Sequence, residues 1–371
     1  MLNNIEIQNY RNLKHLRIEK LGRVNLIIGR NNTGKTSLLE GLQILLLLGS
    51  NNIFNSILHA RQEKNPNSNQ IKSRVEELTN LFYGRERGFE ENKMEITSDT
   101  STNYSKKFSL RFIRYIEEQI VIDNTEPWKI FNEKKEVSSN SGESKIGIEV
   151  CKNDEKTILS FDENDLYNTI NADIFFNSRV ADICNFVAAG CETSDKNTER
   201  WWSKTALTEK EVFVTEALNM IEPRIERISQ IKDETFTSRF LIRLGDQKKP
   251  IPLRSMGDGI NRILTIILAM VNCENGYLLI DEFENGLHYS VQEKLWEIIF
   301  HLAERLNIQV FVTTHSSDTI RAFENIVNQN EMIPLDGLLI KLENINDTIK
   351  ATTFEPSELK IITDNLIEVR R

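Results

Sequence analysis

The sequence predicts an α/β fold with a mixed, largely parallel core sheet, an antiparallel β subdomain and a mainly helical insertion. Three apolar runs, residues 23–28, 277–280 and 308–314, have the length and continuous hydrophobicity of strands buried in a parallel sheet. Each run leads directly into glycine or polar residues. In open α/β sheets, ligands bind at this carboxyl edge of the strands, so the candidate site is expected there.

Residues 1–28 predict an antiparallel start followed by a buried strand. Ile5 and Ile7 alternate with polar residues, and a second short strand fits residues 16–18. The run at 23–28 leads into Gly29, and leucines at helical spacing follow Lys35. Strand, glycine loop and helix are therefore expected in this order.

The middle of the chain predicts strands and one long helix. Residues 49–70 are rich in Asn, Ser and Gln and predict a surface loop. Residues 107–122 and 146–161 predict strands separated by charged turns. Residues 207–231 carry apolar positions at helical spacing and predict a helix, which Pro223 would kink or split.

The composition of the chain limits the classes of protein to which it can belong. The 371 residues, 39% of them hydrophobic, suffice for one large folded domain or two. The N-terminus lacks the layout of a signal peptide, and the most apolar run, residues 42–48, is too short to cross a bilayer. We therefore expect a cytoplasmic protein without a membrane partner. The cysteines, whose spacing favours buried thiols over a zinc or disulfide framework, are Cys151, Cys184, Cys191 and Cys273.

Net charge limits how the protein could bind nucleic acid. A formal charge of −9 argues against a protein that coats nucleic acid non-specifically through its whole surface, since that mode needs a net basic footprint. A local basic groove that contacts DNA stays open as one alternative, and a solvated charged face as the other. The candidate cations are Arg61, Lys64, Lys72, Arg74, Arg85 and Arg87.

The segment Gly-Arg-Asn-Asn-Thr-Gly-Lys-Thr after the first buried strand fits the phosphate-binding loop pattern. Its backbone N–H groups and the following helix start form a positive nest for phosphate oxygens. Lys35 would reach the β- and γ-phosphates of ATP, and the Thr36 hydroxyl would bind Mg²⁺. The candidate nucleotide-binding residues are Gly29, Arg30, Asn31, Asn32, Thr33, Gly34, Lys35, Thr36 and Ser37.

Two acids follow the apolar run at 277–280. Asp281 is suited to hold Mg²⁺ directly or through water, and Glu282 to act as general base on the attacking water. The alternative is that both acids merely begin a helix, where acidic residues are favoured. Together with the phosphate loop, the pair predicts a magnesium-dependent ATP hydrolase.

His315 and residues 255–262 complete the set of candidates. His315 ends another buried strand, where its ring could contact the γ-phosphate; a purely structural histidine is the alternative. Residues 255–262, Ser-Met-Gly-Asp-Gly-Ile-Asn-Arg, precede a helical pattern and predict a second anion-binding helix start. Because one chain already supplies a phosphate loop, this start is expected to serve a partner's nucleotide across a dimer. A plain Gly-Asp-Gly turn is the alternative.

Four motifs, in this order and spacing, carry a resemblance to a known group: Gly29–Glu40, Ile251–Gly259, Asp281–His288 and Thr313–Asp318. With them the chain resembles the ABC-type ATPase heads related to chromosome-maintenance proteins and OLD nucleases. It is most similar to the OLD-like ATPases grouped under the AAA label. The match covers both ends of the chain, whereas residues 50–241 match only loosely, as the family's variable insertion does.

The resemblance implies an ABC-type P-loop head that forms a head-to-tail dimer, or a higher homo-oligomer, with ATP at each interface. The implied signature that completes the opposite site consists of Ser255, Gly257, Asp258 and Gly259. The implied D-loop consists of Asn285, Gly286, Leu287 and His288. The catalytic residues would be Glu282, Lys35 and His315, with Thr36 and Asp281 on the metal.

The same resemblance implies a division of the chain and a partner. Residues 1–165 would be the first part of the head, with a variable loop near 49–92, residues 166–235 a helical insertion, and residues 236–371 the second part. The resemblance implies that relatives often work with a TOPRIM nuclease, fused or encoded separately, and that many act in anti-phage defence. The 56 residues after His315, which predict a hairpin at 338–354 and a helix from Ser357, are too few for a TOPRIM fold. A separate nuclease or toxin is therefore the expected effector.

Departures from the wider pattern leave two rival functions. The signature is not the Leu-Ser-Gly-Gly-Gln form of transporters, no Q-loop glutamine can be assigned, and no Asn-Lys-x-Asp motif indicates GTP. A RecF-like DNA-repair ATPase shares the element Asn9-Tyr10-Arg11-Asn12, although the Phe-Glu-Asn-Gly-Leu-His continuation after Glu282 argues against it. The other rival is a non-catalytic scaffold that ATP locks as a dimer.

Overall fold

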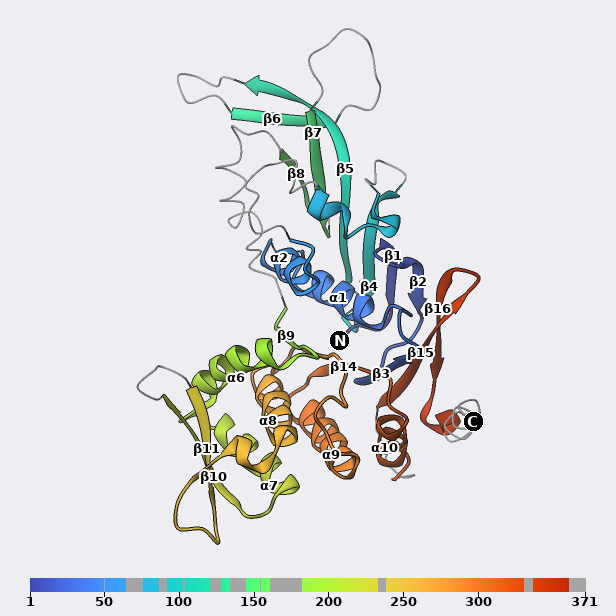
Figure 1. Ribbon diagram of the computed structural model, residues 1–371. Helices are drawn as coiled ribbons and strands as arrows, with labels where there is room; N and C mark the ends of the chain where they lie inside the picture. Colours follow the sequence, from blue (N-terminus) through green and yellow to red (C-terminus); the bar gives the residue numbers. More distant parts are fainter. Residues whose placement is uncertain are drawn as a thin grey trace.

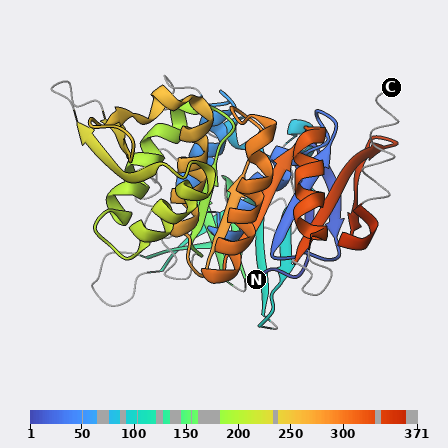
Figure 2. The ribbon, with the colours of Figure 1, turned by 90° about the horizontal axis from the view of Figure 1, so that it is seen from below.

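Two large β-sheets enclose the first helix, α1 (Lys35–Leu46), in the computed structural model (Figure 1). The structure describes residues 1–49, 51–64, 76–86, 92–102, 104–120, 128–133, 145–153, 155–160, 182–232, 238–329 and 336–359. Helices on the other face of one sheet form a further layer (Figure 2).

The core sheet contains the three predicted buried strands side by side. Its order is β16 (Thr348–Phe354), β15 (Gly337–Ile345), β3 (Val24–Gly29), β14 (Gln309–Thr314), β13 (Tyr277–Ile280) and β9 (Cys184–Val187). All neighbours are parallel except β16, which pairs antiparallel with β15. The mixed, largely parallel sheet is therefore confirmed.

Alternate side chains of this sheet belong to two separate hydrophobic cores. Leu26 and Val312 belong to the core shared with α8, α9 and α10, whereas Ile27 and Phe311 belong to the core shared with α1. Because successive side chains of a strand point to opposite faces, continuous apolar runs are required where both faces are covered. The covering helices on the first face are α8 (Asp258–Val271), α9 (Tyr289–Arg305) and α10 (Ser317–Asn328).

The second large sheet is antiparallel and covers α1 from the other side. It contains β1 (Ile5–Tyr10), β2 (Leu13–Ile18), β4 (Met94–Asp99), β5 (Ser105–Ile120), β6 (Trp128–Glu133), β7 (Lys145–Lys152) and β8 (Glu155–Ser160). The predicted antiparallel start is confirmed, as are the strand regions at 107–122 and 146–161 within their described residues, where the second region is a β7–β8 hairpin.

The helix predicted at 207–231 is wrong in its second half. Helix α7 (Lys210–Ile221) ends before Pro223, and β10 (Ile225–Lys232) follows, paired with β11 (Ser238–Leu244). The register of this pair shifts between Ile225 and Arg227. One extra residue there lets Ile225 and Ile228, three positions apart, both be buried, which imitates helical spacing. The short β12 (Ile251–Pro252) completes this sheet, and α6 (Cys191–Thr205) packs on α8.

The loop predicted at 49–70 is also wrong for residues 51–60. Helix α2 (Asn51–Ala60) occupies this segment and buries Ile53, Phe54, Ile57 and Leu58. These apolar positions recur at i, i+1, i+4 and i+5, so they form one face of a helix within a polar composition. Phe54 lies against Phe108 of β5, with ring centroids 5.9 Å apart.

The C-terminal part forms the predicted hairpin, β15–β16, and residues 356–359 are helical; residues 360–371 of the helix predicted from Ser357 lie outside the described part. Among the described helices, none is long and apolar enough to cross a membrane. The proposed division at 165/166 falls in residues 161–181, outside the described part, and the division into three parts remains a proposal.

Candidate functional site

The phosphate loop connects β3 to α1 by a path that requires glycine at position 34. Gly34 has φ 85° and lies directly before the first residue of α1. A Cβ there would lie 2.7 Å from Leu13 Cδ2 in the β1–β2 turn region. Glycine alone combines this left-handed backbone with so close an approach. Arg30, Asn31 and Asn32 of the loop are exposed, whereas Thr33 and Ser37 are buried.

Lys35 is folded back over the loop. Its ammonium donates to the carbonyl oxygen of Gly29 at 2.8 Å and of Arg30 at 3.1 Å. Burial lowers the pKa of Lys35, while the charges of Asp281, Glu282 and Glu284 act in the opposite direction. The ammonium is thus placed above the loop and close to the acids, where phosphate oxygens would offer it stronger acceptors.

Thr36 and Asp281, 245 positions apart in sequence, are in contact. The Thr36 hydroxyl donates to Asp281 Oδ2 at 3.1 Å, and Thr313 Oγ1 donates to Asp281 Oδ1 at 2.6 Å. Burial raises the pKa of Asp281, although the hydrogen bonds from Thr313 and Thr36 act to lower it. A buried carboxylate beside a hydroxyl fits Mg²⁺, because the ion would offset the cost of burying the charge.

Within the described residues, no group of three or more His, Cys, Asp or Glu side chains could hold a metal by itself. The small number of protein ligands fits Mg²⁺, because in phosphate-transfer sites this ion takes one or two protein ligands together with phosphate oxygens and water. Thr36 and Asp281 would be those protein ligands.

Glu282 is held at the edge of the sheet in a strained backbone conformation. Its φ is 49°, which is unusual for a residue other than glycine and is typical of functional sites. Its N–H donates to Thr313 Oγ1 at 2.9 Å, and Asn285 Nδ2 donates to its Oε2 at 2.8 Å. Helix α9 begins only at Tyr289, so the alternative in which the two acids begin a helix is wrong.

His315 lies at the end of β14 and is held by an acid that the sequence did not single out. Glu284 Oε1 lies 2.9 Å from His315 Nδ1 and accepts from the His315 N–H at 2.9 Å. Thr314 Oγ1 donates to Glu284 Oε2 at 2.7 Å. Glu284 thus joins the ends of β13 and β14. The sequence signal that could have identified Glu284 was its position two residues after Glu282 in the segment Asp-Glu-Phe-Glu.

Arg262 is a second missed residue. It is buried in α8, and its Nη2 donates to the carbonyl oxygens of Asp281 at 2.8 Å and Glu282 at 3.3 Å. Its Nη1 donates to the carbonyl oxygen of Ala188 after β9. The sequence signal that could have identified Arg262 was its place on an otherwise apolar helix face. A guanidinium buried there requires hydrogen-bond acceptors, so a structural contact could have been predicted.

The predicted signature does lie at a helix start. Ser255 is in a short 3₁₀ turn (Leu253–Met256), Gly257 has φ 100°, and Asp258 is the first residue of α8. A Cβ at Gly259 would lie 2.9 Å from the carbonyl oxygen of Gly286, so α8 approaches the D-loop closely. Among the described residues, no hydrogen bond or ion pair joins the four signature residues to the phosphate loop of the same chain.

The D-loop residues lead from the acid pair into α9. Asn285 contacts Glu282, Gly286 has φ 74°, and Leu287 is buried. His288 caps α9, since its Nδ1 accepts from the N–H of Ser290 at 3.3 Å.

The candidate basic groove is only partly described. Arg61 Nε lies 2.8 Å from Glu40, and Arg85 Nη2 lies 3.2 Å from Glu63. Both arginines thus pair with acids of their own chain. Lys72, Arg74 and Arg87 lie outside the described residues.

Comparison with known proteins identifies the family whose sequence model this chain matches. The family model described as an AAA ATPase domain matches residues 1–320. A Helicobacter pylori protein named ATP/GTP phosphatase is 23% identical over 364 residues, covering 89% of this chain and 90% of that protein. A DNA replication and repair protein RecF of Bacillus mycoides is 41% identical over 51 residues, 14% of each chain.

Solved structures agree in fold. The chain is similar to an SMC head bound to the C-terminal winged-helix domain of ScpA, with a TM-score of 0.53 and 10% identity over 95% of this chain and 97% of that one. It is also similar to an SMC head with an extended coiled coil, bound to the C-terminal domain of ScpA derived from Pyrococcus furiosus. The TM-score there is 0.51, with 9% identity over 100% of this chain and 99% of that one. The expected ABC-type P-loop head fold is confirmed.

Proposed function

Because this chain belongs to the family of AAA ATPase domains and is therefore an ATPase, we propose that it works as an ATP-driven dimeric switch of the OLD-like type. The observation that carries the proposal is the contact between Thr36 and Asp281 at 3.1 Å, with Glu282 held beside it. These residues come from the phosphate loop and from the acidic strand end, the two parts that nucleotide hydrolysis requires.

The proposed roles follow from the positions of the side chains. Lys35 binds phosphate oxygens in place of its present carbonyl acceptors, and Thr36 and Asp281 hold Mg²⁺, which neutralises the charge of the transferred phosphoryl group. Glu282 accepts the proton of the attacking water, and Asn285 fixes the direction of its carboxylate. His315, positioned by Glu284, donates toward the γ-phosphate.

A dimer is proposed because, among the described residues, no hydrogen bond or ion pair joins the signature to the phosphate loop of the same chain. Ser255, Gly257, Asp258 and Gly259 would contact the γ-phosphate bound by a partner in a head-to-tail dimer, or in a higher homo-oligomer. Binding of ATP would close the dimer, and hydrolysis would reopen it.

The biological output is proposed from the OLD-like resemblance alone. A separate TOPRIM-type nuclease or toxin would be the effector, in a cytoplasmic phage-defence system. DNA contact remains a secondary proposal, because Arg61 and Arg85 already pair with acids.

The local match to RecF supports one alternative, a DNA-binding ATPase of recombination or repair. This match covers only 14% of the chain, whereas the family model covers residues 1–320. The support for a repair function is therefore weaker than the support for an ATPase in general. An ATP-locked scaffold without turnover is the other alternative.

The test is to measure ATP binding and phosphate release, with Mg²⁺ or with EDTA, for wild type, Lys35→Ala and Glu282→Gln. We expect Lys35→Ala to lose nucleotide binding and Glu282→Gln to retain ATP while turnover falls at least about a hundredfold. Unchanged turnover in Glu282→Gln would remove the general-base assignment. ATP-dependent dimers without any turnover in wild type would favour the scaffold.

A further inference from the structure

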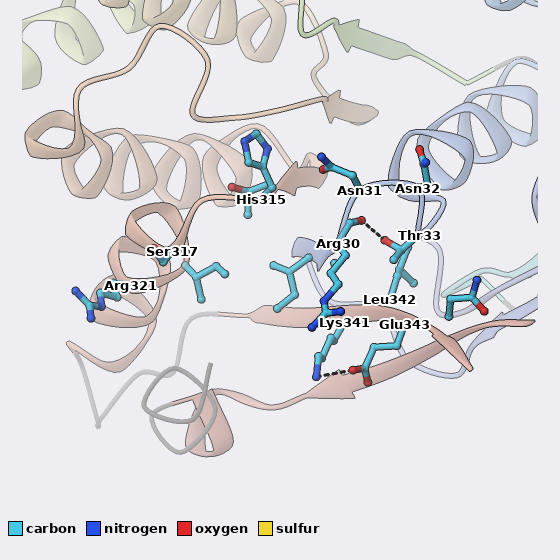
Figure 3. A pocket seen from close by; sticks show the side chains of 15 residues that line it. Arg30, Asn31, Asn32, Thr33, His315, Ser317, Arg321, Lys341, Leu342 and Glu343 are labelled. Carbon is cyan, nitrogen blue, oxygen red and sulfur yellow. Dashed lines mark hydrogen bonds and ion pairs between the residues drawn. The ribbon is translucent and has the colours of Figure 1, made fainter. Parts of the chain in front are cut away.

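Cationic side chains gather both beside the phosphate loop and on the small sheet of β10, β11 and β12. The first group lines a cavity of about 680 Å³ that borders the ATP site, because Gly29, Arg30 and His315 also line it (Figure 3). The small sheet lies at the opposite end of the molecule from β6 (Figure 1) and contains no residue that is assigned to the ATP site. Residues 225–254, which include this sheet, carry seven lysines and arginines and four acids, a local charge of +3 in a chain of net charge −9.

The two faces of the small sheet have different surroundings. On the inner face, Ile228 and Ile242 are buried in the core shared with α8, and Phe240 packs on Trp202 of α6 with ring centroids 5.8 Å apart. Because successive side chains of a strand point to opposite faces, the alternate positions form the outer face. The outer face, on which only Leu241 is half-buried and the other positions are exposed, consists of Arg227, Ser229, Ile231, Arg239, Leu241 and Arg243.

Arg227 and Arg243 lie directly opposite each other on this outer face. Like charges in opposite positions of a sheet destabilise the strand pair. Glu226 Oε2 lies 3.2 Å from Arg243 Nε, but both side chains are more than half exposed, where an ion pair contributes little. Among the described residues, no acid forms an ion pair with Arg227. The two arginines therefore repel each other in the free protein, and a bound anion would relieve this repulsion.

The outer face fits the phosphate backbone of a duplex nucleic acid. Arginine binds phosphate through its planar fork, and a serine hydroxyl such as that of Ser229 is a further donor. Arg239 lies about 13 Å along β11 from Arg243, at 3.3 Å per residue, so the face offers cations to more than one phosphate. Lys248 and Lys249, in the exposed turn after β11, add to the positive charge near Arg243.

A duplex suits this face better than a single strand does. Proteins that bind single strands stack the bases on aromatic side chains. None of the described outer-face positions listed above is aromatic, so the bases would find no stacking partner there. Contacts to the phosphates of a duplex do not need such partners.

We propose that the outer face of β10, β11 and β12 binds duplex nucleic acid through its phosphates. This binding goes beyond the ATP-driven switch and uses residues other than Arg61 and Arg85. The net negative charge of the rest of the chain repels phosphates, which confines the duplex to this face. Strand β12 leads directly into the 3₁₀ turn that contains Ser255, so the duplex lies on the segment that precedes the proposed signature.

The experiment measures the fluorescence anisotropy of a short labelled DNA duplex with the full chain, without nucleotide, at several salt concentrations. We expect Arg227→Thr combined with Arg243→Thr to weaken binding by about tenfold or more. The slope of log affinity against log salt should fall by about two, about one for each lost phosphate contact. Arg17→Thr, which removes an exposed arginine from β2, is the matched control and should bind like wild type. Because no nucleotide is added, a failure of the proposed ATPase switch leaves this result unaffected.

The melting temperature of the double arginine variant separates a lost contact from a damaged sheet. It should equal or exceed that of wild type, because two opposed charges are removed and threonine suits an exposed strand. If it falls instead, Lys248→Ser combined with Lys249→Ser in the turn decides the question, and this variant should also weaken duplex binding.

Three results would overturn the proposal. They are the absence of duplex binding by wild type at low salt, equal binding by wild type and the folded variants, and stronger competition by polyglutamate than by unlabelled duplex of equal charge. The last result would indicate an acidic protein as the partner. A parallel titration with an RNA duplex shows which nucleic acid is preferred, and either preference fits, because both present a phosphate backbone.

Discussion

The negative charge of Asp281 destabilises the folded protein when no cation lies beside it. Its side chain is buried and accepts hydrogen bonds from Thr313 and Thr36, yet burial still raises its pKa. Stability is therefore sacrificed at this position, as is common where function needs a buried charge. Glu282 adds backbone strain next to it, with φ 49°.

We predict that Asp281→Asn raises the melting temperature of the nucleotide-free protein while abolishing turnover. A raised folded-state pKa means that the native chain holds the proton more tightly than the unfolded chain. The stability penalty is therefore absent below the ordinary value of 3.8 and grows as pH rises through the folded-state pKa. The gain from Asp281→Asn should be small near pH 4 and full at pH 8.

Scanning calorimetry in EDTA at both pH values checks this. Asp258→Asn, which changes an exposed acid at the start of α8, serves as the control. A wild type that melts above Asp281→Asn at pH 8 would contradict the account.

At the scale of elements, α8 links the signature to the acid pair. Arg262 binds the carbonyl oxygens of Asp281 and Glu282, and Gly259 lies against the carbonyl oxygen of Gly286. We therefore expect a shift of the start of α8 to displace the acids and the D-loop as well. Contact of a partner's nucleotide with the signature would in this way affect the catalytic residues of the signature's own chain.

We predict that Arg262→Lys lowers kcat by about tenfold or more while ATP binding stays near that of wild type. Lysine keeps the charge, but one ammonium cannot reproduce the planar fork that reaches carbonyls of two segments. Steady-state kinetics with a separate binding measurement checks this, and Arg200→Lys on α6 is the control. Equal losses of binding and turnover would indicate a general folding defect.

We also predict that Gly259→Ala destabilises the protein by about 1–3 kcal/mol, because its Cβ would lie 2.9 Å from the Gly286 carbonyl oxygen. Gly190→Ala is the matched control, since a Cβ there meets nothing within 4 Å. Denaturant unfolding of both variants measures the difference. Similar midpoints for the two would show that α8 and the D-loop can separate without cost.

The elements that the sequence predicted well are those whose signal is local. The buried strands were visible as continuous apolar runs, and the phosphate loop as glycines between a strand and a helix. Arg262 and Glu284 were missed because their partners are distant in sequence and meet them only in the folded protein. The partners of Arg262 lie 19, 20 and 74 positions away, and those of Glu284 lie 30 and 31 positions away. Strand β10 was taken for a helix because its register shift lets Ile225 and Ile228, which are three positions apart in sequence, both be buried, and this imitates helical spacing.

At the scale of the whole molecule, the fold gathers the candidate catalytic residues at one edge of the core sheet. The phosphate loop follows β3, the acid pair follows β13 and His315 follows β14, and these three strands are neighbours. The signature instead lies at the start of α8 and makes no hydrogen bond to that loop within the described residues. The proposed dimeric switch depends on this separation.

The most direct test of the switch mixes two inactive chains and measures phosphate release. Lys35→Ala removes the phosphate-binding lysine, and Ser255→Arg blocks the signature. In a head-to-tail dimer, the mixed pair regains one intact site, with the loop from the Ser255→Arg chain and the signature from the Lys35→Ala chain. With random pairing and independent sites, we predict recovery of about a quarter of wild-type turnover. No recovery, while mixed dimers form normally, would show that the signature does not act across a dimer and would contradict the account.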